Sequence, residues 1–224
     1  AELTNKTERR MSGRDLRPSG LVRIATTDTL LYALLAPEIA RLRRLEPDIT
    51  LEIVVSNEIS DLSLREADIA IRPSSTPDPH LFGRKLGIIS QGIYARHNVE
   101  LSAQDPQSLA SLPWLGPSPS MPYSQLHSWM KDNGYDDACV CTADTVLGLY
   151  TGVRSGIGIA VLPDYLAEPD PELIRLGAHV DEVAVELWLL THPDLRHTAR
   201  VRAVLDHFAG SEPVRARLLQ EQGG

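Results

Sequence analysis

The side chains of this chain that could bind a ligand are hydroxyl, amide and guanidinium groups that follow expected strands. Eight of them are candidates for contact with a small molecule: Thr26, Thr27, Thr29, Ser56, Asn57, Arg72, Ser74 and Thr145. The threonines near residue 26 precede an expected helix, whose N–H groups and dipole favour an anion. Arg72 offers a planar guanidinium that suits a carboxylate. These residue types predict that the site binds a small carboxylate-bearing molecule.

Each candidate also has a purely structural interpretation. Thr26, Thr27 and Asp28 are candidates for capping the first helix, and Asp144 could cap the helix that follows it. Capping alone explains Asp28, whose charge otherwise disfavours an anion. Ser56 and Asn57 could be turn residues only. Arg72 could pair with a surface acid instead of a ligand, and the sequence favours neither role. These alternatives stay open at the level of sequence.

No catalytic centre is indicated. The segment GPSPS (116–120) lacks the glycine spacing of a nucleophile elbow, and His192 and His197 lack the helical spacing of a zinc pair. Cys139 and Cys141 would share one face of a strand without good disulfide geometry, and no neighbouring cation lowers a thiol pKa, so a redox role is the minor alternative. We therefore expect no catalytic residue, no metal and no cofactor.

The segment from Gly152 to Pro163 predicts a helix end, a glycine turn and a buried strand. Gly156 stands where a left-handed residue would close a helix over 145–155, and the apolar run 157–162 predicts a strand. Glycines placed before a strand reverse the order of the dinucleotide fingerprint, which runs from strand through glycines to helix. A tight turn is therefore the better interpretation than a nucleotide site.

The elements that position these residues form two α/β units. The first should contain strands 21–25, 49–55 and 68–71, a helix over 31–45 interrupted at Pro37, a short helix over 60–65 and a loop over 72–79. Residues 83–94 predict a long strand, or two strands joined near 90–92. The second should contain helices 105–110, 123–131 and 145–155, and strands near 114, 138–141, 157–162 and 183–190, followed by helices 198–208 and from Pro213.

Long strands near 88–95 and 183–191 would join the two units as crossovers. Such a pair of connections predicts a hinged molecule with a cleft between its halves. The expected division is residues 20–92 plus 191–224 for the first subdomain and 93–190 for the second. Ligands bind at the carboxyl ends of strands in open α/β sheets, and the candidate residues above stand at those ends.

Charge is unevenly distributed along the chain. The 224 residues carry a net charge of −8, and residues 1–20 contribute +2, which leaves −10 for the rest. An acidic body repels phosphate backbones, so direct nucleic-acid binding by this part is disfavoured. No apolar run approaches the roughly 20 residues that span a bilayer. The chain begins with Ala rather than Met, and residues 2–14 suggest an exposed helix fragment, so we expect a preceding segment.

Six segments in order resemble the effector-binding domain of LysR-type transcriptional regulators. They are GLVRIA (20–25), LLAP (34–37), EPDITLE (46–52), EADIAIR (66–72), GIGIAVLP (156–163) and RVRAVLD (200–206). The resemblance covers residues 20 to about 210. In addition, RMSGRDLRPSG (10–20) resembles the end of the linker helix that joins this domain to a winged helix-turn-helix. Residues 1–19 would then be a remnant of that helix.

The resemblance implies a periplasmic-binding-protein-like fold of type II, an α/β fold with two Rossmann-like subdomains joined by crossover strands around a cleft. It implies a small-molecule effector, commonly a small organic acid or an aromatic compound, in that cleft. It further implies a cytoplasmic protein that forms dimers or tetramers and contacts DNA through a domain outside this chain. Dimerisation would pair the helix near 30–45 with the strand region 51–57 of a partner.

Two other classes of protein remain as alternatives. A secreted solute-binding protein shares the expected fold, but the basic residues between 6 and 17 and the linker-like segment argue against it. The complete gene would separate these two interpretations. An enzyme is the third class, and no acid/base pair in the sequence supports it.

Overall fold

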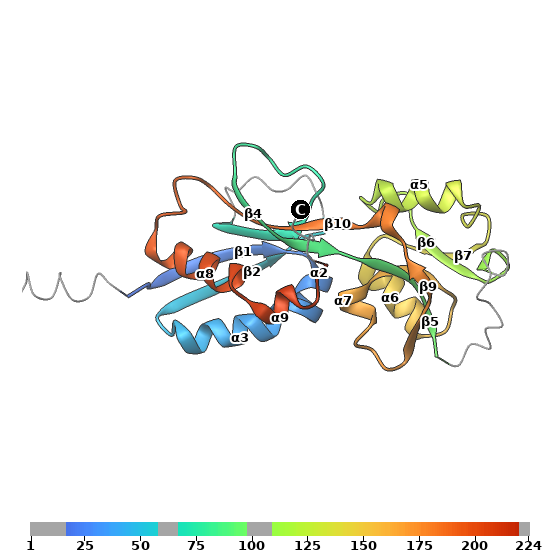
Figure 1. The fold of residues 1–224 in the computed structure, drawn as a ribbon, viewed down its shortest axis with the longest axis horizontal. Coiled ribbons are helices and arrows are strands. Elements are labelled where there is room, and N and C mark those ends of the chain that lie inside the picture. The colour runs from blue at the N-terminus through green and yellow to red at the C-terminus, as the bar shows by residue number, and fades with distance from the viewer. Residues whose placement is uncertain (1–16, 58–66, 98–108, 220–224) are drawn as a thin grey trace, which may run out of the picture.

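The computed structural model describes residues 17–57, 67–97 and 109–219. The expected helix fragment 2–14, the short helix 60–65 and most of the helix 105–110 lie outside these ranges. Within them, no helix is both long enough and apolar enough to cross a bilayer. The elements fall into two groups at opposite ends of an elongated molecule, with β4, β5 and β10 running between them (Figure 1).

The first group is built on a five-stranded sheet with the order β2-β1-β3-β10-β4. Its strands are β1 (Gly20–Thr26), β2 (Ile49–Val55), β3 (Ile69–Pro73), β4 (Phe82–Ile89) and β10 (Val185–Thr191). β1 pairs in parallel with β2 and β3, the pairing expected of consecutive strands in an α/β unit. β10 runs antiparallel between β3 and β4.

β3 is longer than the sequence predicts. A loop over 72–79 is wrong for its first two residues, because Arg72 and Pro73 complete β3 opposite Trp188 and Leu187 of β10. Pro73 is tolerated because it occupies the last position of the strand, where the missing N–H costs least. The two extra residues place Arg72 near the carboxyl ends of the parallel strands, where the other candidate ligand-binding residues also lie.

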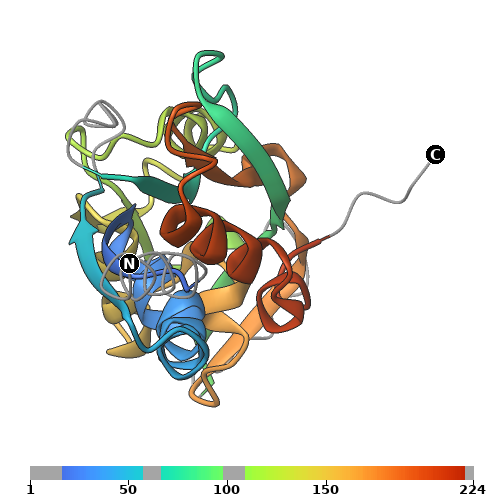
Figure 2. The ribbon, with the colours of Figure 1, turned by 90° about the vertical axis from the view of Figure 1, so that its left-hand side faces the viewer.

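Helices cover the first sheet. They are α2 (Asp28–Leu30), a π-helical turn η1 (Leu31–Leu35), α3 (Ala36–Leu45), α8 (Ala199–Ala209) and α9 (Glu212–Arg215). The predicted interruption at Pro37 takes the form of the π turn, in which the Ala36 N–H donates to the Leu31 carbonyl five residues earlier. α8 packs on β1 and β10, and Figure 2 shows it beside α3 at one end of the molecule.

The second group contains two smaller sheets. β5 (Gln91–Arg96) lies between β8 (Ala160–Pro163) and β9 (Leu173–His179) with antiparallel pairing, and β6 (Trp114–Pro117) pairs in parallel with β7 (Cys139–Ala143). The accompanying helices are α5 (Ser124–Asp132), α6 (Val146–Arg154), α7 (Asp164–Ala167) and the 3₁₀ turn η2 (Asp181–Val183). Neither β9 nor α7 is predicted by the sequence.

The chain crosses between the two groups twice. Ser90 separates β4 from β5, which confirms that the expected long strand is two strands joined near 90–92. Residues 180–184 lead from β9 to β10. β10 is hydrogen-bonded along its length within the first sheet. The division of the subdomains at 92/93 and 190/191 stays a prediction.

The glycine turn has the predicted backbone. Gly156 has a φ of +79° just after the end of α6, as expected for a residue that closes a helix. The following strand is shorter than the expected 157–162, because β8 begins only at Ala160. Ile159 instead forms an isolated parallel bridge to Trp114, and its N–H donates to the Pro113 carbonyl at 2.8 Å. The backbone thus packs directly on Pro113.

Both cysteines lie on β7 without a disulfide. The Cys139 thiol donates to the Tyr135 carbonyl, and Cys141 is exposed. Burial, with a smaller contribution from the nearby Asp136 charge, raises the pKa of the Cys139 thiol. A raised pKa disfavours the reactive thiolate. The geometry therefore supports a packing role for Cys139 over a redox role.

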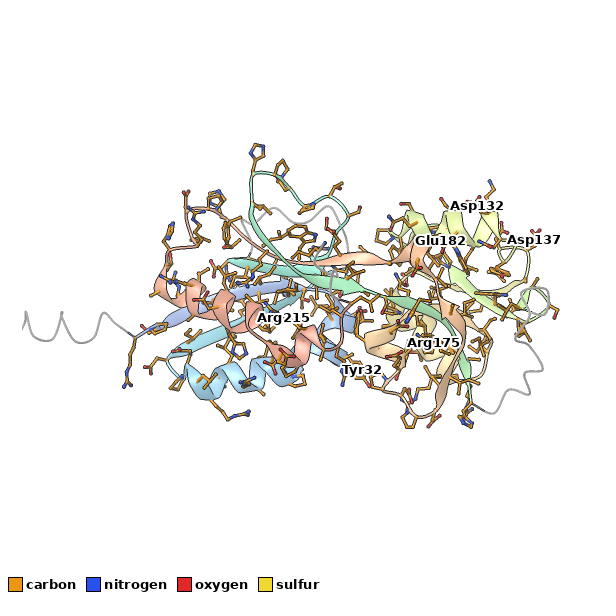
Figure 3. All side chains as sticks on the ribbon, viewed as in Figure 1. Tyr32, Asp132, Asp137, Arg175, Glu182 and Arg215 are labelled. Carbon is orange, nitrogen blue, oxygen red and sulfur yellow. The ribbon has the colours of Figure 1, made fainter. Side chains whose placement is uncertain are left out.

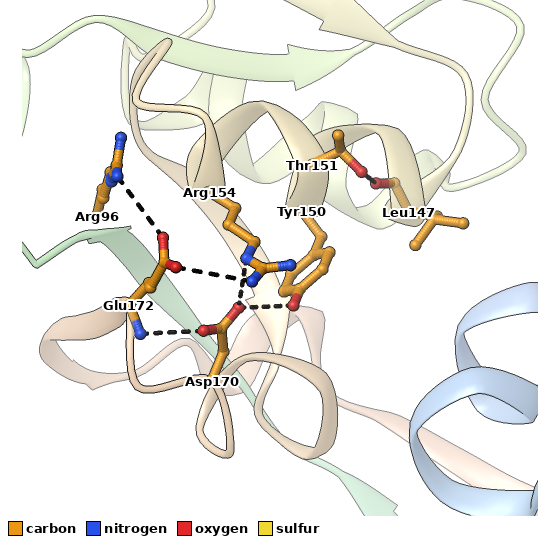
Figure 4. Close-up of polar contacts among 7 residues, drawn as sticks. All are labelled: Arg96, Leu147, Tyr150, Thr151, Arg154, Asp170 and Glu172. Atoms are coloured by element: carbon orange, nitrogen blue, oxygen red, sulfur yellow. Dashed lines mark hydrogen bonds and ion pairs between the residues drawn. The ribbon is translucent and has the colours of Figure 1, made fainter.

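A polar network ties the end of α6 to the loop before β9 (Figure 4). The Tyr150 hydroxyl donates to the Asp170 carboxylate at 2.6 Å, and Arg154 lies 3.3 Å from the same carboxylate. Glu172 pairs with both Arg154 and Arg96. Burial opposes ionisation of Asp170, but the bonds from Tyr150 and the Glu172 N–H and the charge of Arg154 outweigh it, so the pKa of Asp170 is lowered.

Replacement of Gly158 should destabilise the fold through a backbone clash. A Cβ atom at Gly158 would lie 2.2 Å from the Pro113 carbonyl oxygen. We expect Gly158→Ala to lower the free energy of unfolding by about 1–3 kcal/mol, measured by urea denaturation. Gly156→Asn is the control, because Asn tolerates a positive φ and the nearest atom to a Cβ there is 3.7 Å away. Equal losses for the two variants would contradict the proposed clash.

Asp170 should make the protein sensitive to acid. Since its folded pKa is lowered, the ionised carboxylate stabilises the fold above the unfolded pKa of about 3.9, and this contribution is lost as the pH falls through the folded pKa. The free energy of unfolding of Asp170→Asn should therefore fall less than that of the parent between about pH 5 and pH 3. The exposed Asp137, labelled in Figure 3, provides the control Asp137→Asn. Identical pH profiles for Asp170→Asn and the parent would refute the role of Asp170.

Candidate functional site

A cavity of about 280 Å³ lies between the two groups of elements, at the carboxyl ends of β1 and β3 and at the starts of α2 and α6. Both groups contribute to its wall. The lining residues are Thr27, Asp28, Thr29, Asn57, Arg72, Pro73, Ser74, Ser75, Thr76, Ile89, Met121, Pro122, Tyr123, Ser124, Gln125, Asp144, Thr145, Val146, Pro163, Tyr165 and Val185. This position agrees with the rule that ligands bind at the carboxyl ends of strands in α/β sheets.

Six of the eight residues predicted from the sequence meet at this cavity. They are Thr27, Thr29, Asn57, Arg72, Ser74 and Thr145. Thr26 and Ser56 are not among the lining residues. Thr26 is the buried last residue of β1, and its carbonyl accepts from the Ser56 N–H at 3.0 Å, so both residues serve the junction of β1 and β2. Contact of the other six with a ligand stays a prediction.

The start of α2 is already hydrogen-bonded from within the protein. Thr27, rather than Asp28, is the N-cap, and its hydroxyl accepts from the Leu30 N–H. The Asp28 carboxylate accepts from the Thr29 N–H at 2.6 Å and from the Asn57 amide at 3.0 Å, and the Asp28 N–H donates to Asn57. An anion would have to displace these bonds in order to use the helix N-terminus. The expected role of the free N–H groups is therefore not supported by this geometry.

The start of α6 shows the same pattern on the opposite wall. Thr145 is the N-cap, and its hydroxyl accepts from the Gly148 N–H at 3.1 Å. Asp144, which the sequence suggests as the cap, instead lines the cavity. In both helices the capping position falls one residue away from the aspartate, on a threonine whose extended backbone lets its hydroxyl accept the bond.

The charges on the described part of the wall are mixed. Arg72 is 3% exposed and supplies the guanidinium, while Asp28 and Asp144 supply carboxylates from the two opposing helix starts. α2 and α6 are in contact, so these carboxylates belong to facing elements. The wall therefore presents both hydrogen-bond acceptors and donor groups toward the cavity.

Two tyrosines of the wall are absent from the sequence prediction. Tyr165 follows Pro163 and Asp164, a pair typical of a helix start, although the apolar run 157–162 predicts only a strand that ends before Pro163. Its hydroxyl bonds the Thr29 hydroxyl at 2.9 Å, and both side chains are buried. Burial raises the pKa of Tyr165, so its phenol stays neutral. This bond joins α7 to α2 at the wall of the cavity.

Tyr123 precedes α5 and forms another part of the wall. Its hydroxyl donates to the Val183 carbonyl at 3.2 Å and accepts from the buried Gln91 amide. Burial raises the pKa of Tyr123 to about 12, which keeps the phenol neutral at physiological pH. The sequence offers no signal for this group of contacts, because its three members are separated by tens of residues.

Removal of the Thr29–Tyr165 bond should reveal coupling between the two sides of the cavity. Tyr165→Phe leaves the Thr29 hydroxyl buried without its partner, so we expect a loss of about 1–3 kcal/mol in the free energy of unfolding. Thr29→Val should cost a similar amount. The double variant should cost less than the sum of the two, because both polar partners are then gone. Additive losses in chemical denaturation would contradict the coupling.

Comparison with known proteins shows that this chain is similar to part of several transcriptional regulators. The model of the family "LysR substrate binding domain" matches residues 16–211. The Mau operon transcriptional activator of Paracoccus denitrificans is 28% identical over 197 residues, which cover 88% of this chain and 66% of the relative. The HTH-type transcriptional regulator CrgA of Neisseria meningitidis is 28% identical over 202 residues, with 84% and 66% covered. The chain thus spans just under two thirds of the length of these relatives.

Solved structures show the same fold. The regulatory domain of CrgA, a LysR-type transcriptional regulator from Neisseria meningitidis, has a TM-score of 0.74 and 26% identity, covering 86% of this chain and 98% of that one. The effector domain of AmpR from Pseudomonas aeruginosa has a TM-score of 0.70 and 19% identity, with 89% and 98% covered. These likenesses confirm the predicted two-subdomain, type II periplasmic-binding-protein-like α/β fold. The chain belongs to the LysR substrate binding domain family.

Proposed function

We propose that this chain is the part of a transcriptional regulator that binds a small-molecule effector in the cavity between its subdomains. The observation that carries the proposal is that both groups of elements supply the wall, with Thr27 and Arg72 on one side and Thr145 and Tyr165 on the other. A ligand there contacts both subdomains at once. It would favour whichever relative arrangement gives it the better contacts.

The arrangement of the subdomains would affect DNA binding by the remainder of the regulator. The named relatives are transcriptional regulators, and the acidic body of this chain argues against direct contact with DNA. We therefore propose that DNA is bound by an N-terminal winged helix-turn-helix outside this chain. A regulator of this kind would act in the cytoplasm. No catalytic role is proposed. Effector binding can change DNA binding only if the effector has different affinities for two arrangements of the subdomains.

Self-association fits the exposed apolar surface of the first group. Tyr32, on the π turn, is 61% exposed, and Leu45 at the end of α3 and Val55 at the end of β2 are also exposed (Figure 3 labels Tyr32). These residues fall in or beside the helix and strand that the family resemblance assigns to dimer contacts. Their exposure is compatible with the interface that the family resemblance implies. We propose a dimer or a tetramer for the full regulator.

Thermal stability in the presence of small molecules tests the proposed ligand cavity. A panel of aliphatic and aromatic carboxylates with their matched amides should contain a compound that raises Tm. A ligand at 100 times its Kd adds about 2.7 kcal/mol of stability. For a chain of this size that corresponds to about 5–10 °C. The matched amides show whether the carboxylate itself is recognised.

A variant that fills the cavity locates the binding site of any active compound. Ser74→Trp places a large side chain at a lining position, and Ser155→Trp places the same side chain at an exposed position outside the lining. The rise in Tm should disappear in the first variant and persist in the second. A panel without any active compound, or a rise that survives Ser74→Trp, would count against the proposal.

A further inference from the structure

The two crossings of the chain are hydrogen-bonded to each other beside the cavity. The Val180 N–H, in the segment that leads to β10, donates to the Gln91 carbonyl at 2.8 Å. The Asp164 N–H at the start of α7 donates to the Ser90 carbonyl at 3.0 Å. Any change in the angle between the subdomains must therefore move both crossings together.

The Gln91 side chain adds a second link between the crossings. It is 1% exposed, and its amide nitrogen donates to the Val183 carbonyl and to the Tyr123 hydroxyl. The orientation of the amide follows from chemistry, because a backbone carbonyl only accepts, and so the nitrogen rather than the oxygen must face Val183. Both N–H groups of the amide are consequently used.

Tyr123 closes this arrangement on the side of the cavity. Its hydroxyl also donates to the Val183 carbonyl, so that Gln91, Tyr123 and Val183 form a closed triangle of hydrogen bonds. Tyr123 stands immediately before α5, and α5 packs against the 3₁₀ turn that contains Val183. The ring that lines the cavity is thereby bonded to both crossings.

We propose that Gln91 is a positioning residue that couples the cavity wall at Tyr123 to the two crossings, so that the position of Tyr123 and the angle between the subdomains change together. The proposal rests on the proposed function for the identity of the site. A ligand that displaces the Tyr123 ring would act on the hinge directly. The coupling itself is a property of the protein without ligand.

The physical basis is the burial of the amide. A buried amide that loses a hydrogen bond has no water to replace it, so intermediate positions of the crossings are disfavoured. Packed elements shift between discrete arrangements and do not deform continuously. The bonds of Gln91 therefore favour arrangements in which Tyr123, Val183 and the start of β5 keep their relative positions.

A distance measurement between the subdomains tests the coupling without any ligand. Spin labels are placed at Arg43→Cys on α3 and Asp132→Cys on α5, both exposed, in a chain with Cys139→Ser and Cys141→Ser (Figure 3 labels Asp132). Pulsed electron paramagnetic resonance then gives the distribution of label distances. Gln91→Met and Tyr123→Phe each remove hydrogen bonds with little change of volume, and each should shift or broaden this distribution.

The double variant and a matched tyrosine provide the controls. Gln91→Met together with Tyr123→Phe should change the distribution no more than either alone, since both act on one network. Tyr150→Phe removes a tyrosine hydroxyl bonded to Asp170 within the second group, and it should leave the distribution unchanged. If Gln91→Met fails to fold, Tyr123→Phe alone carries the test.

Two outcomes would overturn the coupling. One is an unchanged distribution in the folded Gln91→Met and Tyr123→Phe variants, and the other is an equal change in Tyr150→Phe. Because no ligand is present, either outcome leaves the proposed cavity site standing if a compound still raises Tm. Conversely, a changed distribution with no active compound in the panel supports the coupling while the ligand proposal fails.

Discussion

The backbone passes between the two groups of elements at Ser90 and again at residues 180–184, and the bond from Val180 to Gln91 holds these passages side by side. The rest of the molecule depends on this double passage. It brings β10 back into the first sheet between β3 and β4, although all the strands of the second group lie between β4 and β10 in sequence. The first sheet is therefore complete only after the chain has passed through the second group and returned.

The cavity is a consequence of the same arrangement. The starts of α2 and α6 face each other because the two groups meet at the crossings, and the polar residues at the strand ends are enclosed between them. Each helix start is capped by its own threonine, Thr27 or Thr145. The wall is thus ordered before a ligand binds. A ligand that used these helix starts would have to form hydrogen bonds at least as favourable as the internal bonds that it displaced.

Much of this fold could be predicted from the sequence, because its signals are local. Regular apolar spacing identifies α6 and β2, and a glycine with positive φ marks the turn at Gly156. β9 escapes prediction because Gly177 with a φ of +78° and a bulge opposite Gly92 interrupt its pattern. α7 has only four residues, too few for a helical period.

Part of the site could also be predicted from the sequence. Ligands of α/β proteins bind at the carboxyl ends of the strands, and this rule, which needs only the order of the elements, correctly places six candidates at the cavity. The bonds that occupy the start of α2 depend on Asn57, and the contact of Thr29 depends on Tyr165, 136 residues away. Such partners follow from tertiary packing, which no local pattern contains. Each cap falls on a threonine beside an aspartate, and local sequence does not decide between such neighbours, because both residue types cap helices.

The π turn at Leu31–Leu35 has a geometric consequence for the length of this helix. The widened turn absorbs one extra residue, so the segments on either side keep nearly the orientation of a continuous helix. Deletion of a single residue here would therefore restore a regular helix and leave Thr29 on the side of Tyr165. What the extra residue changes is the spacing along the sequence: across this turn, residues five apart rather than four apart lie one above the other. An apolar pattern that is counted as one unbroken α-helix is out of step by one residue at this point.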